Sequence, residues 1–338
     1  MPAKLRLHAA PATLVSLAVI LVLAIALAPS LAPATFSGKN GRISFFRFVE
    51  RPESVEIYTA EPNGADVQKL TSMPGFGSFN SDWSPNGQRI AFDSIDFEEG
   101  HRHISQIYLM DANGDGLRQL TTSPGRHGGQ MTPGWSPNGH NLAIGASWGA
   151  RSLQGIWIIP ASGRVTQEEA ERLTTRPEGF LRDAEPQFSP DGNSIAFSRF
   201  KDARTSAIFR VGIDGSGLER LTPWRLNASH PDWSPDGQKI TFDSGDFGGR
   251  TDGGGNIWVM RADGSRRRKL TNYERRRKGE PGNLANNPVW SPSGTRIMFV
   301  HFLPNGSEFV AMRPNGSHKR VVLDGHHFQN RVDWGTHP

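Results

Sequence analysis

Short stretches in which apolar and polar residues alternate recur along most of the chain. Examples are residues 89–92, 194–197, 239–242 and 296–299. Each is followed by a second apolar stretch, such as 106–110 or 256–260, and then by a turn that contains glycine. Alternation with a period of two predicts β-strands, and turns at this frequency predict many short ones. The pattern therefore indicates an all-β protein.

A five-residue motif, Trp/Phe-Ser-Pro-x-Gly, recurs between these strands. Its copies lie at residues 83–87, 135–139, 188–192, 233–237 and 290–294, and Trp334-Gly335 begins a sixth. The aromatic residue that opens each copy, here called the anchor, recurs every 44 to 57 residues. Five of the units close on Leu-Thr, at 70/71, 120/121, 173/174, 221/222 and 270/271. A period of about 40 to 50 residues is typical of a repeat architecture.

Each unit contains four expected strands. The first ends at the anchor, the second follows the Pro-x-Gly turn, the third carries an Ile-aromatic pair and the fourth ends in Leu-Thr. Residues 41–71 supply the last three strands without a first one, and residues 330–334 supply a first strand alone. Joining these fragments completes a sixth unit. The sequence thus predicts a six-bladed β-propeller over residues 35–338, with four-stranded antiparallel blades and ring closure between the N- and C-terminal strands, which removes exposed sheet edges.

The first 34 residues have the features of a secretory signal peptide. Lys4 and Arg6 precede an apolar run over residues 14–28, and Ala32-Pro33-Ala34 offers a cleavage site after Ala34. The alternative is an uncleaved membrane anchor, because residues 12–28 reach the lower limit of a spanning length. We expect a periplasmic or secreted protein.

Composition and charge narrow the function classes. The absence of cysteine excludes disulfides, thiolate zinc sites and cysteine nucleophiles. With 38 glycines and 24 prolines the chain does not suit a helical bundle. Removal of Lys4 and Arg6 with the signal lowers the net charge from +5 to +3, so the overall charge does not indicate nucleic acid.

The repeat resembles the WD40-like, or PD40, β-propeller repeat of the TolB family. The resemblance covers residues 41–338 and rests on the five Trp/Phe-Ser-Pro-x-Gly motifs. It implies the propeller fold and an exported location. The α/β domain that precedes the propeller in TolB has no counterpart between the signal and the first strand. Similar propellers also act as substrate gates in prolyl oligopeptidase-type peptidases and form the body of oligogalacturonate lyases, so the fold alone does not decide the function.

The candidate binding site is a ring of six polar residues, each three positions before an anchor. They are Asn80, Thr132, Glu185, His230, Asn287 and Arg331. The first strand of a blade is the innermost, so we expect the six to surround the mouth of the central channel, on the same face as the long loops. The alternative is that these residues are polar only because the channel holds water.

Other patterns offer weaker candidates. Asp93 and Asp96 have near-duplicates in Asp243 and Asp246, which could bind a cation or a sugar but are also typical of Asp-capped turns. Seven histidines fall in long loops or at strand ends and could bind a metal or be solvated: His101, His103, His127, His230, His301, His326 and His327. Residues 111–116 resemble half of a calcium loop, but Thr122 stands where the bidentate glutamate belongs, which favours a hairpin turn.

Two basic runs concentrate positive charge. The first is residues 266–269, and the second consists of Arg275, Arg276, Arg277 and Lys278. The second run is a candidate contact for envelope polyanions, with plain solvation as the alternative. Tyr273 is the only aromatic residue near them, so base stacking lacks a platform and nucleic acid is not expected.

We therefore expect an exported, monomeric, non-catalytic scaffold that binds a protein or peptide of the cell envelope through the channel mouth, with no metal or cofactor. One alternative is a glycan-binding protein or a metal-dependent lyase-type enzyme that uses His230 with the loop histidines or aspartates. Another is a sensing ectodomain held by an uncleaved anchor.

Overall fold

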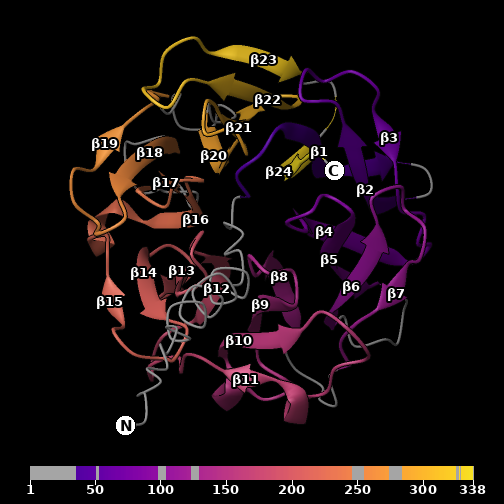
Figure 1. The fold of residues 1–338 in the computed structure, drawn as a ribbon, viewed down its shortest axis with the longest axis vertical. Helices are drawn as coiled ribbons and strands as arrows, with labels where there is room; N and C mark the ends of the chain where they lie inside the picture. The colour runs from indigo at the N-terminus through magenta and orange to yellow at the C-terminus, as the bar shows by residue number, and fades with distance from the viewer. Residues whose placement is uncertain are drawn as a thin grey trace, which may run out of the picture. The chain divides into compact units, whose positions relative to one another are not determined.

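The regular secondary structure of the described residues is almost entirely β-strand (Figure 1). A computed structural model describes residues 36–50, 53–97, 104–122, 129–245, 255–273, 284–324, 327 and 329–337. The chain divides into two units, Met1–Leu31 and Ala32–Pro338, and all described residues belong to the second. The expected signal peptide and its cleavage site after Ala34 lie outside the described residues.

Four sheets contain four antiparallel strands each. Their strands are β8 (Gln130–Trp135), β9 (Asn141–Ala146), β10 (Gly155–Pro160) and β11 (Glu171–Arg172); β12 (Arg182–Phe188), β13 (Ser194–Phe200), β14 (Ser206–Gly212) and β15 (Glu219–Arg220); β16 (Ala228–Trp233), β17 (Lys239–Ser244), β18 (Asn256–Arg261) and β19 (Arg268–Lys269); β20 (Leu284–Trp290), β21 (Ile297–Leu303), β22 (Gly306–Met312) and β23 (Arg320–Leu323). Within each sheet the strands follow chain order.

A larger sheet of eight strands combines the beginning and the end of the fold. It contains β1 (Asn40–Glu50), β2 (Glu53–Ala60), β3 (Gln68–Lys69), β4 (Phe76–Trp83), β5 (Arg89–Asp96), β6 (Ser105–Asp111), β7 (Arg118–Gln119) and β24 (Gln329–Thr336). Strand β24 pairs antiparallel with β1, with Trp334 opposite Ile43. A single parallel pair, Val55 and Gly77, joins β2 to β4. The prediction of an all-β chain with four-stranded antiparallel sheets is confirmed.

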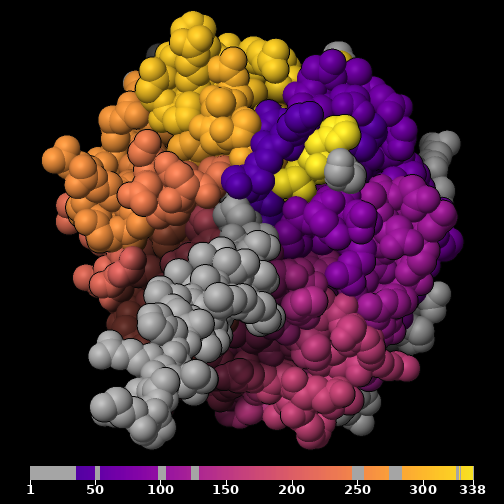
Figure 2. Space-filling view, in the orientation of Figure 1, coloured from indigo at the N-terminus to yellow at the C-terminus, as the bar shows by residue number. Residues whose placement is uncertain are grey.

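Figure 1 shows the sheets succeeding one another around a common centre in chain order. In Figure 2 the yellow atoms of the C-terminal residues lie among the indigo atoms of the N-terminal strands, in agreement with the pairing of β24 and β1. Three short 3-10 helices complete the described structure: η1 (Arg151–Leu153), η2 (Gln167–Glu169) and η3 (Trp224–Leu226). In the described ranges, no helix has the length and hydropathy needed to cross a membrane.

The anchors form the core between neighbouring sheets. All six are at most 5% exposed: Trp83, Trp135, Phe188, Trp233, Trp290 and Trp334. Trp135 illustrates the packing, because it shares one apolar cluster with Ile107 and Leu109 of β6 and with Leu142 of its own sheet. Burying a large aromatic side chain supplies about 3 kcal/mol. The repeated anchors therefore hold adjacent sheets together.

The Leu-Thr and Ser-Pro-x-Gly motifs each satisfy a backbone donor. In five units the threonine hydroxyl accepts the N–H of the isoleucine in the third strand at 2.9 Å, as Thr222 does for Ile208. The motif serine accepts the N–H five residues later at 2.9 to 3.0 Å, as Ser136 does for Asn141. The motif glycine adopts a positive φ, 70° at Gly139, which favours glycine. These residues are structural.

Candidate functional site

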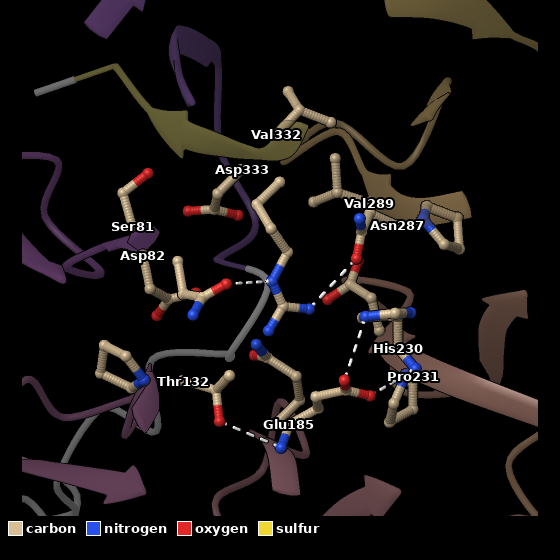
Figure 3. A pocket seen from close by; sticks show the side chains of 16 residues that line it. Ser81, Asp82, Thr132, Glu185, His230, Pro231, Asn287, Val289, Val332 and Asp333 are labelled. Atoms are coloured by element: carbon tan, nitrogen blue, oxygen red, sulfur yellow. Dashed lines mark hydrogen bonds and ion pairs between the residues drawn. The ribbon is translucent and has the colours of Figure 1, made fainter. Parts of the chain in front are cut away.

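All six residues of the predicted ring line one small cavity of about 60 Å³ (Figure 3). They come from six different strands, β4, β8, β12, β16, β20 and β24, and are Asn80, Thr132, Glu185, His230, Asn287 and Arg331. We call them the mouth residues. The structure thus brings together side chains that lie about 50 residues apart in sequence, and their role in binding stays a prediction.

The backbone of every mouth residue is left-handed. Their φ angles lie between 48° and 59°, although none is glycine. In each case the strand is bulged next to the residue, because the pairing with its neighbour shifts register there. A non-glycine residue in this conformation costs about 1–3 kcal/mol, least for asparagine, and such strain clusters at functional sites. In four units the next residue is proline: Pro133, Pro186, Pro231 and Pro288.

Side chains from one sheet hold the bulges of the next. Thr132 N–H donates to the carboxylate of Asp93 at 3.0 Å, and the hydroxyl of Thr132 accepts Glu185 N–H at 3.1 Å. Glu185 in turn accepts His230 N–H at 3.0 Å. Asn287 N–H donates to Asp243 at 2.8 Å. The strained conformations are therefore fixed by hydrogen bonds that run around the cavity.

The imidazole of His230 lies between two carboxylates. Its Nδ1 lies 2.7 Å from Asp243 and its Nε2 lies 3.0 Å from Glu185, and its side chain is 20% exposed. Burial disfavours the imidazolium, but the two carboxylates outweigh burial and raise the pKa of His230 to about 9. His230 is thus protonated at neutral pH. Burial also acts against the charge on Glu185, yet His230 and Arg331 lower the pKa of that carboxyl well below its ordinary value.

Arg331 contributes the second cation. Its Nε donates to Asn80 at 2.6 Å and its Nη1 donates to Asn287 at 3.1 Å. Asn80 also donates to Asp93, which is 3% exposed, at 2.7 Å. The cavity therefore presents fixed groups of both signs together with amide groups, which suits a polar or zwitterionic partner group better than an apolar one.

A second layer of carboxylates lies beside the mouth residues. Asp82, Asp232 and Asp333 line this cavity and also a smaller one of about 20 Å³. Each accepts the backbone N–H of an anchor in the next unit, at 2.9, 2.7 and 2.8 Å respectively. Asp82 and Asp232 thereby fix one sheet against another, and Asp333 links β24 to β4 within the larger sheet. Burial raises the pKa of Asp333 to about 6, and burial with repulsion from Asp333 raises the pKa of Asp82 well above its ordinary value. Sequence reasoning missed this layer, although an aspartate directly before the anchor was the available signal.

The remaining sequence candidates have varied outcomes. Asp93 and Asp243 are buried and support the mouth residues, as described above. Residues 111–116 form a hairpin turn in which Asn113 accepts the N–H of Asp115, as the hairpin interpretation predicts. The side chain of His301 pairs with Glu308 at 2.9 Å. Across the described ranges, no group of three or more His, Asp or Glu side chains is arranged to hold a metal ion.

Several candidates fall outside the described residues. They are Asp246, His101, His103, His127, His326 and the run Arg275, Arg276, Arg277 and Lys278. Of the other basic run, Arg267 donates to the carbonyl of Leu221 and Arg268 to that of Asn315, so these two side chains brace neighbouring turns.

Curated relatives share parts of the chain. An uncharacterized protein from Agrobacterium fabrum, Atu1656, is 29% identical over 65% of this chain and 69% of its own length. Dipeptidyl-peptidase 5 from Porphyromonas gingivalis is 37% identical over 32% of this chain. The chain spans only 16% of that peptidase.

Comparison with solved structures and family models assigns the fold. TolB from Acinetobacter baumannii superposes with a TM-score of 0.67 at 18% identity, over 97% of this chain and 74% of TolB. A putative TolB from Agrobacterium tumefaciens superposes with a TM-score of 0.60 at 22% identity, over 88% of this chain and 99% of that one. The model of the TolB beta propeller domain, PD40, matches residues 124–336. Because that match covers more than half of the chain, the protein belongs to the TolB beta propeller (PD40) family.

Proposed function

We propose that the protein is a non-catalytic binding module that takes up a segment of an envelope protein or peptide at the cavity of the mouth residues. The observation that carries this proposal is the ring itself. Six polar side chains, which stand on strained backbone and include both signs of charge, converge on one opening, and their hydrogen bonds hold them in place before any partner arrives. Preorganised groups of this kind lower the entropic cost of binding.

The size of the cavity supports a protein or peptide partner over a sugar. Its volume of about 60 Å³ corresponds to about two water molecules, whereas sites for small molecules usually measure about 300–1,000 Å³. A single side-chain tip or chain terminus fits that space. His230 and Arg331 would meet an acidic group of the partner, and Glu185 would meet a basic one.

We also propose that the described unit is a six-bladed propeller. Four separate four-stranded sheets supply four blades, and the two parts of the larger sheet, joined by one parallel pair, supply two more. In this arrangement β24 completes the blade of β1, β2 and β3. The run of Lys4, Arg6 and the apolar residues that follow supports export, and the family supports a place in the cell envelope.

The test is capture of partners from an envelope extract by the protein as the cell processes it. A triple variant, Glu185→Asn, His230→Asn and Arg331→Asn, removes the charges and keeps a residue that tolerates a left-handed backbone, since asparagine already occupies positions 80 and 287. Arg204→Gln, at an exposed arginine that does not line the mouth cavity, is the control.

We expect wild type and the control to retain the same specific protein and the folded triple variant to lose it. Equal retention by all three proteins would refute binding at the mouth. Retention of glycan alone would favour the carbohydrate alternative.

A further inference from the structure

A second cavity, with a lining distinct from that of the mouth cavity, lies against the sheets β8–β11 and β12–β15. Its volume is about 400 Å³, and its lining shares no described residue with the mouth cavity. The walls come from the ends of β8 and β9, from η1 with Gln154, and from residues 176–182. Its size falls within the usual range for small-ligand sites, about 300–1,000 Å³.

Three arginines dominate the described lining of this cavity, and no carboxylate accompanies them. Arg151, Arg176 and Arg182 all line it. Arg176 donates to the carbonyl of Phe180, whereas the side chains of Arg151 and Arg182 make no hydrogen bond or ion pair with any described residue. The guanidinium of Arg182 instead lies over the ring of Phe200, 4.7 Å from its centroid.

The acidic side chains nearest in sequence to Arg176 and Arg182 form no ion pair with them. Asp183, which follows Arg182, is fully buried and already binds Arg199 through both carboxylate oxygens at 2.7 Å. Glu178 is exposed and is absent from the lining. The positive charge of the cavity is therefore left for a ligand.

Two polar atoms at this cavity are buried without a partner. The hydroxyl of Ser147 has none, although the residue is only 8% exposed, and Nε of Arg182 also has none. A buried polar group without a hydrogen bond costs free energy, and a ligand that pairs with it removes that cost. Folded proteins satisfy nearly all such groups, so an acceptor supplied by a ligand would complete the hydrogen bonding of these two atoms.

Apart from Gln154, whose side chain bonds the backbone of Asp183, the rest of the described lining is apolar. Met131, Ala146, Phe180 and Leu181 contribute to it, and Leu181 is 48% exposed. A charged ligand without an apolar part would leave this apolar wall in contact with water. The cavity therefore fits an anionic group attached to an apolar one.

We propose that this arginine cavity binds a carboxylate that is joined to an apolar group. The carboxylate accepts from the planar guanidinium of Arg182 and from the hydroxyl of Ser147, while Arg151 and Arg176 add positive charge at the entrance. Arginine suits this role because its donors match the two oxygens of a carboxylate. The same chemistry occurs at the C-terminus of a peptide and in a free amphipathic acid, and the site is independent of the mouth residues.

Calorimetric titration of the protein as the cell processes it tests the proposal. One arm compares N-acetyl-leucine with its uncharged amide, N-acetyl-leucinamide. The other compares a pentapeptide that ends in leucine with a free carboxylate and the same pentapeptide with a C-terminal amide. We expect the free carboxylates to bind at least about tenfold more tightly than the amides. Tighter binding of the pentapeptide identifies a peptide terminus as the source, and equal binding identifies a free acid.

Variants then locate the site. Arg182→Gln should weaken binding about tenfold or more. If that variant fails to fold, Arg151→Gln replaces it: the position is exposed, and this variant should also weaken binding. Ser147→Ala should weaken binding without lowering the melting temperature, because its hydroxyl has no partner to lose. Arg204→Gln removes one positive charge outside the arginine cavity, and the triple mouth variant removes the charged groups of the mouth cavity. Both variants should bind the carboxylate ligands as tightly as wild type does.

Any one of four results would overturn the proposal. The first three are equal affinity for acids and amides, no binding up to about 1 mM ligand, and equal weakening by Arg204→Gln. Preference for galacturonic acid over N-acetyl-leucine would also overturn it, because a wholly polar acid makes no use of the apolar wall.

Discussion

Replacing His230 with asparagine removes the titrating cation of the mouth and keeps the left-handed backbone. The position has φ 51°, and asparagine adopts nearly the same φ at positions 80 and 287. Asparagine has no imidazole to protonate, so Asp243 and Glu185 lose their shared cation. The variant isolates the electrostatic role of His230 from the geometry of the bulge.

The pKa of His230 sets both the sign and the size of the effect. The pKa is about 9 in the folded protein against 6.5 in an unfolded chain. The protonated imidazole therefore stabilises the fold fully below pH 6.5, and this contribution disappears as the pH rises through about 9. The difference in pKa corresponds to about 3 kcal/mol at most. Because 20% of the side chain is exposed to screening solvent, we expect about 2 kcal/mol.

Urea unfolding followed by tryptophan fluorescence at several pH values from 6.5 to 9.5 measures this contribution. The free energy of unfolding of wild type should fall by about 2 kcal/mol more than that of His230→Asn over this range. His140→Gln is the matched control: His140 is exposed, and glutamine holds the same turn position at 88 and 238. Parallel curves for wild type and His230→Asn, or a wild type that gains stability with rising pH, would refute the assigned charge state.

Three further predictions concern stability. The pKa of Asp333 is raised to about 6, so its ionisation destabilises the fold as the pH rises from about 4 to 6. In thermal melts over that interval, Asp333→Asn should therefore lose less stability than wild type. The same slope of melting temperature against pH in both proteins would contradict this. Thr222→Val leaves Ile208 N–H without its acceptor and should cost about 1–3 kcal/mol in urea unfolding, whereas Thr222→Ser should retain most of the stability; equal losses would argue against the hydrogen bond. Trp135→Ala should cost about 3–5 kcal/mol by the same measurement, and a loss below about 1 kcal/mol would mean that the anchor does not hold adjacent sheets together.

The repeat made the strands and the mouth predictable. Anchors at a regular period fix where each first strand ends, so the residue three before each anchor occupies the same place in every sheet. The six mouth residues follow from that single offset, without any knowledge of their contacts. Thr132 and Glu185 were found in this way although nothing in their side chains is alike.

The supporting groups were harder to predict because they depend on contacts across sheets. Asp93 and Asp243 resembled turn caps, yet they reach the bulges of the following unit. The arginine cavity gave no signal in the sequence, because its arginines lie where the units differ from one another: Arg151 in η1, Arg176 in a connection and Arg182 at the start of β12. Periodicity reveals only what every repeat shares.

The pairing of β24 with β1 affects the order in which the protein can fold. Trp334 lies opposite Ile43, so about 290 residues separate the partners, whereas the other strands pair largely across short turns. Closing a loop of that length costs about 5 kcal/mol of chain entropy, against about 2 kcal/mol for a ten-residue hairpin. During synthesis the edge of β1 stays open until β24 emerges, and an open edge invites association with other chains. We therefore expect a slow last step. Since Asn40 lies opposite Thr336, a circular permutant that joins these ends and opens between β7 and β8 should fold faster.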